Sequence, residues 1–231
     1  PLTRLAARHI AVTCLSDIAG LTGQAARSRE LLIWVASQSG IPDRERLWAL
    51  TGLAELSARI GQSQAAAQYF ADARRIGIKD QYLVSAYADF LLDQGRSQEV
   101  VRLLEADIKP DGLLLRLALA EQAQHLPAAK DHTAMLAARF SASRARGTRI
   151  HLREEARFTL VLLAHPHQAL TLAQANWDIQ KEPWDARLLL ESALASGDLD
   201  AAKPVLDWLN TNHVEDTWLR ELAARLSKGH T

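Results

Sequence analysis

The stretch between Leu47 and Lys109 contains one residue pattern twice, with an offset of 34 residues. The equivalent positions are Gly61 and Gly95, Ala54 and Ala88, Ala66 and Val100, and Phe70 and Leu104. Each copy predicts a helix, a glycine turn and a second helix, so the repeated unit is a helical hairpin. Because one hairpin cannot bury its apolar face alone, a repeated hairpin favours a stacked array over a single globule.

The pattern resembles the tetratricopeptide repeat (TPR) family, whose helical hairpin is about 34 residues long. The first copy matches the family at Leu50, Leu53, Ala54, Gly61, Ala66, Phe70 and Ala73, and the second at Val84, Tyr87, Ala88, Gly95, Val100 and Leu104. Three departures are visible. Leu50 stands in the place of the usual Trp, Asp107 replaces the last small residue, and Ile78 and Gly112 replace the terminal proline. The resemblance implies an all-α, right-handed α-α superhelix.

Composition agrees with helices that pack closely. Apolar residues make up 48% of the chain and aromatic residues only 6%, so most of the apolar content is Ala and Leu, which are strong helix formers. Lys plus Arg and Asp plus Glu both number 27, so no net charge attracts nucleic acid. The single cysteine, Cys14, excludes an internal disulfide. No apolar run reaches the roughly 18 residues that a membrane span needs, so we expect no membrane insertion.

The remaining turn signals extend the array to one solenoid domain over residues 1–231. We predict about six hairpins and a C-terminal capping helix at residues 2–40, 43–77, 79–108, 111–146, 148–182, 184–212 and 215–228. The domain is expected to be a fragment of a longer protein. Its C-terminal half looks like uncharacterised proteobacterial TPR proteins, which implies a bacterial origin but leaves a periplasmic or exported and a cytoplasmic location open.

Helix starts and ends are predicted from capping residues. We expect Asp43 and Thr148 to be N-caps, Pro127 and Pro166 to lie in first turns, and Gly147 to end a helix. Pro183 is expected to terminate a hairpin. In the final helix, Trp218, Leu222 and Leu226 are predicted to share one apolar face.

Catalytic and metal-binding patterns are weak. His165 and His167 are two residues apart at a helix start, so their side chains diverge and chelate poorly. Cys14 has no base on its own helical face, since His9 is five residues away, and we expect a structural, half-buried thiol. The sequence therefore indicates a protein that is not an enzyme, with no catalytic residues, no metal and no cofactor.

Binding residues are predicted from the family resemblance, because solenoids of this type bind along a concave face made by the first helix of each hairpin. Carrying over the family's second, fifth, ninth and thirteenth positions selects Trp48, Thr51, Glu55, Arg59, Tyr82, Ser85, Asp89, Asp93, Trp184, Arg187 and Glu191. Arg116, Arg153 and Arg157 are added as contributors from the two hairpins whose turns contain no glycine.

This mixture of aromatic residues and charges of both signs is typical of a peptide-binding surface. The acidic pair Asp89 and Asp93 could favour a basic ligand. Alternatively, the charges could form solvated ion-pair ladders between adjacent helices. We therefore expect a non-enzymatic scaffold that binds a peptide or protein segment.

A second hypothesis is a structural subunit that associates with itself through its N-terminal hairpin. An apolar edge at Leu5, Val12, Leu15 and Trp34 would then form a homodimer.

Overall fold

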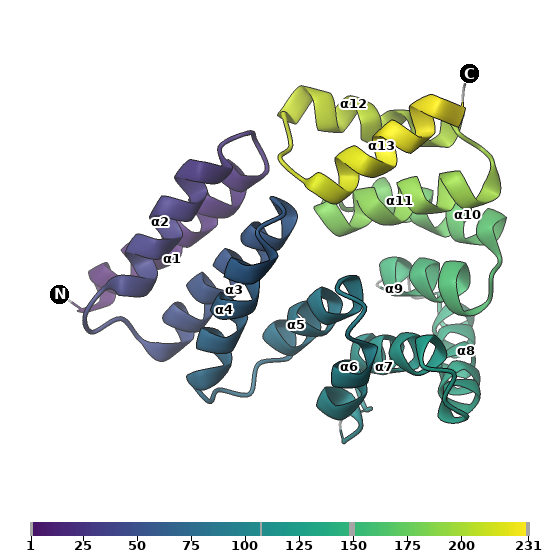
Figure 1. The fold of residues 1–231 in the computed structure, drawn as a ribbon, viewed down its shortest axis with the longest axis horizontal. Helices are drawn as coiled ribbons and strands as arrows, with labels where there is room; N and C mark the ends of the chain where they lie inside the picture. Colours follow the sequence, from purple (N-terminus) through teal and green to yellow (C-terminus); the bar gives the residue numbers. More distant parts are fainter. Residues whose placement is uncertain (1, 107, 148–150, 230–231) are drawn as a thin grey trace. The chain divides into compact units, whose positions relative to one another are not determined.

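A computed structural model of the chain describes residues 2–106, 108–147 and 151–229, and these residues form thirteen α-helices and no β-strand (Figure 1). The predicted all-α class is confirmed. The helices are α1 Leu2–Gly20, α2 Ala25–Ser37, α3 Asp43–Arg59, α4 Ser63–Arg75, α5 Gln81–Asp93, α6 Ser97–Leu104, α7 Asp111–Ala123, α8 Ala128–Ala145, α9 Leu152–Arg157, α10 Pro166–Trp177, α11 Pro183–Ser196, α12 Lys203–Asn212 and α13 Thr217–Gly229. A π-helix, η1, spans Phe158–Leu162, and a 3₁₀ turn, η2, spans Asp200–Ala202. The superhelix and its six repeats stay predictions.

The chain divides into two compact units. Unit 1 contains the residues up to Tyr87 together with Asp207–Trp218, and unit 2 contains Ala88–Leu206 and the residues from Leu219 onward. The chain therefore passes from one unit to the other within helices α5, α12 and α13.

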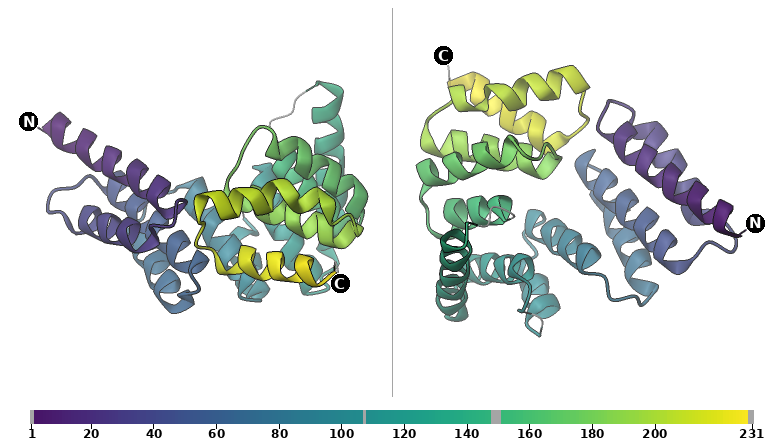
Figure 2. Two further views of the ribbon diagram at one scale, coloured as in Figure 1. Left: turned by 90° about the horizontal axis from the view of Figure 1, so that it is seen from above. Right: turned by 180° about the vertical axis from the view of Figure 1, so that it is seen from behind.

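Unit 1 is held together by consecutive helices that pack in pairs. Helix α1 packs against α2, α2 against α3, and α3 against α4, as the two further views in Figure 2 also show for α1 and α2. The buried cluster at its centre consists of Ala25, Leu32, Val35, Ile41, Ala49, Leu53 and Leu56. Ala49 and Ala54 on α3 are completely buried, so α3 approaches its neighbours closely.

Unit 2 repeats this arrangement and adds contacts between alternate helices. Helix α7 packs against α8, and α9 against α10, while α9 also touches α7 and α11. One cluster contains Leu114, Leu115, Ala118, Leu119, Leu136, Phe140 and Phe158. The rings of Phe140 and Phe158 lie 5.2 Å apart between centroids, which joins α8 to the start of η1.

Several predicted helix ends are shifted by one residue. Pro42 rather than Asp43 occupies the N-cap of α3, and Asp43 lies in the first turn, where its charge favours the positive end of the helix. Pro127 is the N-cap of α8, one residue before the helix starts, whereas Pro166 is in the first turn of α10, as predicted. Pro183 begins α11, because its fixed φ suits a first turn.

Two further predictions concern the region around residue 148 and the last helix. Thr148 lies outside the described residues, as does Asp107, and His151 is the N-cap of α9.

On α13, Leu222 and Leu226 are buried as predicted, but Trp218 is 40% exposed. Leu219 takes its place on the buried face, because it lies three residues before Leu222 on the same side of the helix.

The two hairpins without a turn glycine use other residues in the same left-handed conformation. His125 follows α7 with φ 54°, and Ala164 follows η1 with φ 54°, close to the φ of 69° at Gly95 and 76° at Gly197. Residues with a Cβ rarely adopt this conformation, so no glycine marks these turns, and the sequence indicates them only through the prolines that follow, Pro127 and Pro166. Among the described residues, no helix is both long and apolar enough to cross a membrane.

Because the left-handed conformation strains a residue with a Cβ, Ala164→Gly is expected to raise the free energy of unfolding by about 0.5 to 1 kcal/mol. Gly95→Ala is the matched reverse change, since a Cβ there would meet nothing within 4 Å, and it should lower stability by a similar amount. Urea unfolding measures both. An Ala164→Gly protein less stable than wild type would contradict this account of the turn.

Candidate functional site

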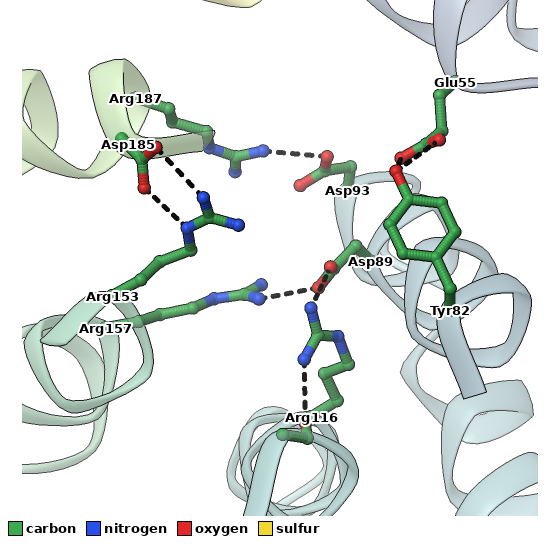
Figure 3. Close-up of polar contacts among 10 residues, drawn as sticks. Glu55, Tyr82, Asp89, Asp93, Arg116, Arg153, Arg157, Asp185 and Arg187 are labelled. Carbon is green, nitrogen blue, oxygen red and sulfur yellow. Dashed lines mark hydrogen bonds and ion pairs between the residues drawn. The ribbon is translucent and has the colours of Figure 1, made fainter. Parts of the chain in front are cut away.

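Eight of the predicted binding residues lie in unit 2, on the four helices α5, α7, α9 and α11. They are Asp89, Asp93, Arg116, Arg153, Arg157, Trp184, Arg187 and Glu191. Figure 3 shows Asp89 and Asp93 on α5 pointing towards arginine side chains from the three other helices. Residues that were selected by the family's spacing on α5 and α11 thus lie together with the three arginines that were added from α7 and α9, and we call this set of eight the unit 2 charge network.

Asp89 is the buried centre of this network. Its side chain is only 6% exposed, and its two carboxylate oxygens accept hydrogen bonds from Arg116 Nη2 and Arg157 Nη1, both at 2.6 Å. Arg116 also donates to the carbonyl oxygen of Gly112 at 2.8 Å, which fixes the guanidinium. Burial by itself would raise the pKa of Asp89, but the two arginines outweigh it and lower the pKa from its ordinary value of 3.8. Asp89 therefore stays ionised and ties α5 to α7 and α9.

Arg187 forms the more exposed end of the network. Its Nη1 donates to Asp93 and its Nε to Glu191, both at 2.8 Å. The carboxylates of Asp93 and Glu191 are 26% and 25% exposed, so solvent reaches this end. Burial raises the pKa of Asp93, helped by the nearby Asp89, although Arg187 and Arg157 oppose the shift. The negative charge of Asp93 is thus less well balanced by arginine than that of Asp89.

Trp184 links the two ends. The guanidinium carbon of Arg157 lies 4.5 Å from the centre of the Trp184 ring, and that of Arg187 lies 4.4 Å from it. A guanidinium over an indole gains cation–π attraction, which is stronger when water is excluded. The aromatic ring and both arginines are consequently held in one orientation.

Asp185 is a member of this region that the sequence analysis missed. Its buried carboxylate accepts hydrogen bonds from Arg153 Nε at 2.5 Å, from Asn176 Nδ2 at 2.7 Å and from the backbone N–H of Glu182 at 2.9 Å. The last bond belongs to a capping box at the start of α11. The sequence contains a signal for this capping box. Asp185 is an acidic residue three positions after Glu182, and Pro183 marks the start of the helix.

Arg153 completes this second group by donating to Glu182 Oε2 at 2.6 Å as well as to Asp185. Burial alone would lower the pKa of Arg153, yet the hydrogen bonds and charges of Asp185 and Glu182 raise it. Arg153 therefore remains a cation and joins α9 to α11.

Six predicted binding residues belong to unit 1. The hydroxyl of Tyr82 donates to the Glu55 carboxylate at 2.9 Å from Oε2, while the tyrosine side chain remains 60% exposed (Figure 3). Trp48, Arg59 and Ser85 are half-buried. Thr51 is buried and its hydroxyl donates to the Leu47 carbonyl, so it cannot contact a ligand.

Comparison with known proteins adds no family to this description. The chain matches no family model, and a search of curated proteins finds no significant match.

The other residues considered for chemistry lie apart from the network. His165 and His167 are exposed, and within the described part of the chain no group of three or more His, Cys, Asp or Glu side chains could hold a metal ion. Cys14 is exposed rather than half-buried as predicted, because it lies on the outward face of α1. The network itself differs from the solvated ladders considered above, since the side chains of Asp89, Arg116 and Arg157 are all less than 15% exposed.

Removing the charge of Asp89 should destabilise unit 2 far more than removing that of Asp93. Asp89→Asn leaves two largely buried guanidinium groups without their counter-charge, which should lower the free energy of unfolding by about 3 kcal/mol at pH 7. Asp93→Asn is expected to change it by less than about 1 kcal/mol, because a half-compensated carboxylate contributes little. Urea unfolding of both variants and of wild type measures the difference.

The pH dependence of the Asp89 effect has a defined sign. Because the pKa of Asp89 is lower in the folded than in the unfolded chain, its stabilising effect is complete above about pH 4 and is lost as the pH falls further. The difference between wild type and Asp89→Asn should stay constant from pH 7 to pH 5 and narrow below pH 4. A difference that does not depend on pH would contradict the ion pairs described here.

Proposed function

We propose that this protein is a non-enzymatic scaffold of the TPR type, which binds a peptide or an extended protein segment along the first helices of its hairpins. One observation carries the proposal. Residues of α5 and α11 that were chosen from the family's binding positions meet arginines of α7 and α9, and Trp184 lies between two arginines, Arg157 of α9 and Arg187 of α11. A tryptophan flanked by arginines is the kind of anchor that dominates protein interfaces.

The residues of this surface have two roles, which depend on how far each is buried. Asp89 is buried and Arg116 and Arg157 are largely buried, so they position the other groups, whereas Asp93, Glu191 and Trp184 are more exposed and available to a ligand. Side chains that are already ordered lose little further entropy on binding, which favours affinity. The network contains both signs of charge, and its acidic groups already have arginine partners. For this reason we propose an extended segment of mixed charge rather than the basic ligand that Asp89 and Asp93 suggested.

Capture of partners from the source cell tests this function. Glu191→Ala and Tyr82→Ala each remove a partly exposed predicted contact without leaving a buried arginine uncompensated. Each should reduce recovery of the captured proteins roughly tenfold, as expected for one contact residue. Arg102→Ala, an exposed change on the second helix α6, is the matched control and should leave recovery unchanged.

The thermal unfolding midpoint of each variant separates a lost contact from a lost fold. If the variants keep the midpoint of wild type and still capture the same proteins equally well, the assignment of the binding face is wrong.

A second function is favoured by the outer face of α1. Ile10, Leu15 and Ile18 are 43%, 60% and 59% exposed, and Ala11 and Cys14 lie on the same face. This face differs from the apolar edge predicted at Leu5, Val12, Leu15 and Trp34. Val12 and Trp34 pack against the core of unit 1, and the side chain of Leu5 lies outside the described residues. A contiguous apolar stripe on a helix is typical of an association surface.

We therefore propose, as an alternative, a structural subunit that forms homodimers through α1. Wild type should then show a molar mass that rises with concentration in light scattering, and Leu15→Glu should abolish the rise. Glu30→Ala, an exposed change on α2, serves as the control. A wild-type protein that is monomeric at every concentration would exclude this function.

A further inference from the structure

The segment Asp207–Trp218 belongs to unit 1, although it follows the whole of Ala88–Leu206 in the sequence. We call this segment the strap. Two hydrogen bonds tie it to the start of the chain. The backbone N–H of Ala25 donates to Glu215 Oε2 at 2.8 Å, and the Thr217 hydroxyl donates to the carbonyl oxygen of Arg59 at 3.0 Å. Partners separated by 190 and 158 residues thus meet in one unit.

The bond to Ala25 acts as a helix cap. Gln24, the N-cap residue of α2, makes no side-chain hydrogen bond to the helix start, so α2 has no local cap. The carboxylate of Glu215 takes that place, and a negative charge at this end is also favoured by the helix dipole. Ala25 is buried, so without the strap its N–H would lose its partner.

The strap also fits closely against a turn of unit 1. A Cβ built on Gly23 would lie 3.0 Å from the Cβ of His213 and 3.1 Å from its carbonyl oxygen. His213 itself has a left-handed φ of 53°, an unfavourable conformation that marks the bend of the strap between α12 and α13. The same turn of the strap thus touches the Thr22–Gln24 bend and supplies the cap of α2.

The strap contacts the rest of unit 1 only through non-covalent interactions, because the chain on either side of it belongs to unit 2. Both of its ends continue into the parts of α12 and α13 that belong to unit 2. The apolar cluster of unit 1, in contrast, is built from α2, α3 and Ile41 in the loop between them. The cluster contains no residue of the strap, so it stays assembled when the strap separates.

We propose that Asp207–Trp218 is a releasable strap, which caps α2 when it is docked and exposes the start of α2 when it is detached. This conformational device is independent of the function proposed above. Its docked state is held by a charge-assisted hydrogen bond and by backbone contact at Gly23. Loss of either should shift the population towards the released state while both hairpins of unit 1 stay folded.

Hydrogen exchange on the full chain tests the strap. In Glu215→Ala, exchange of the amides at the start of α2, Ala25 to Ser28, should become roughly tenfold faster, the effect of losing one hydrogen bond to a charged group. Exchange in α3 and in α7 should stay as in wild type. Glu221→Ala, an exposed change further along α13, is the matched control.

A second pair of variants separates contact with the strap from strain in a turn. Gly23 and Gly40 have nearly the same positive φ, 72° and 75°, but a Cβ on Gly40 would meet nothing within 4 Å. Gly23→Ala should therefore accelerate exchange at the start of α2 and in the strap, and Gly40→Ala should not. Unchanged exchange at Ala25 in Glu215→Ala, or equally faster exchange throughout both units, would overturn the proposal.

Discussion

Close contact between helices at buried alanines is the constraint on which this architecture depends. Ala49, Ala54, Ala88, Ala118 and Ala156 are fully buried on α3, α5, α7 and α9, the helices that also carry most of the predicted binding residues. A methyl side chain at these points lets one helix lie close to the next, so that the rest of each helix can place larger groups to either side. The dispersion energy of such contacts is small for each atom pair and large in sum.

Burial of charge in unit 2 follows from this packing. Asp89 lies between the buried residues Ala88 and Phe90 on α5, and its own side chain is only 6% exposed. An isolated buried carboxylate would be very unfavourable, and only two well-placed guanidinium groups keep it ionised. Four residues further along α5, Asp93 is nearer to solvent and has one arginine partner in Arg187. Residues one helical turn apart thus have opposite pKa shifts, because Asp89 accepts hydrogen bonds from two arginines and Asp93 from one, which does not outweigh the effect of burial.

Much of the fold could be predicted because local sequence determines it. Glycines at 61, 95 and 197 have a backbone conformation that other residues avoid, and each indeed marks a turn between helices. The turns at His125 and Ala164 could not be predicted in this way, since tertiary packing there imposes the left-handed conformation on residues with a Cβ. For the same reason the spacing in the hairpins around them gave only Arg116, Arg153 and Arg157 as contributors. All three arginines nevertheless form ion pairs within unit 2.

By itself, the sequence determined the all-helical class of the described residues and the approximate bounds of most of their helices. These properties follow from periodicity, helix propensity and capping, which act over a few residues. Only the tertiary structure decided that Asp89 binds Arg116 and Arg157, that Asp185 binds Arg153, and that Glu215 caps α2. Each of these pairings joins groups far apart in the chain, and many carboxylates could meet many arginines on composition alone. Which of them meet depends on the angles and distances at which whole helices pack, and that information is not local to any stretch of residues.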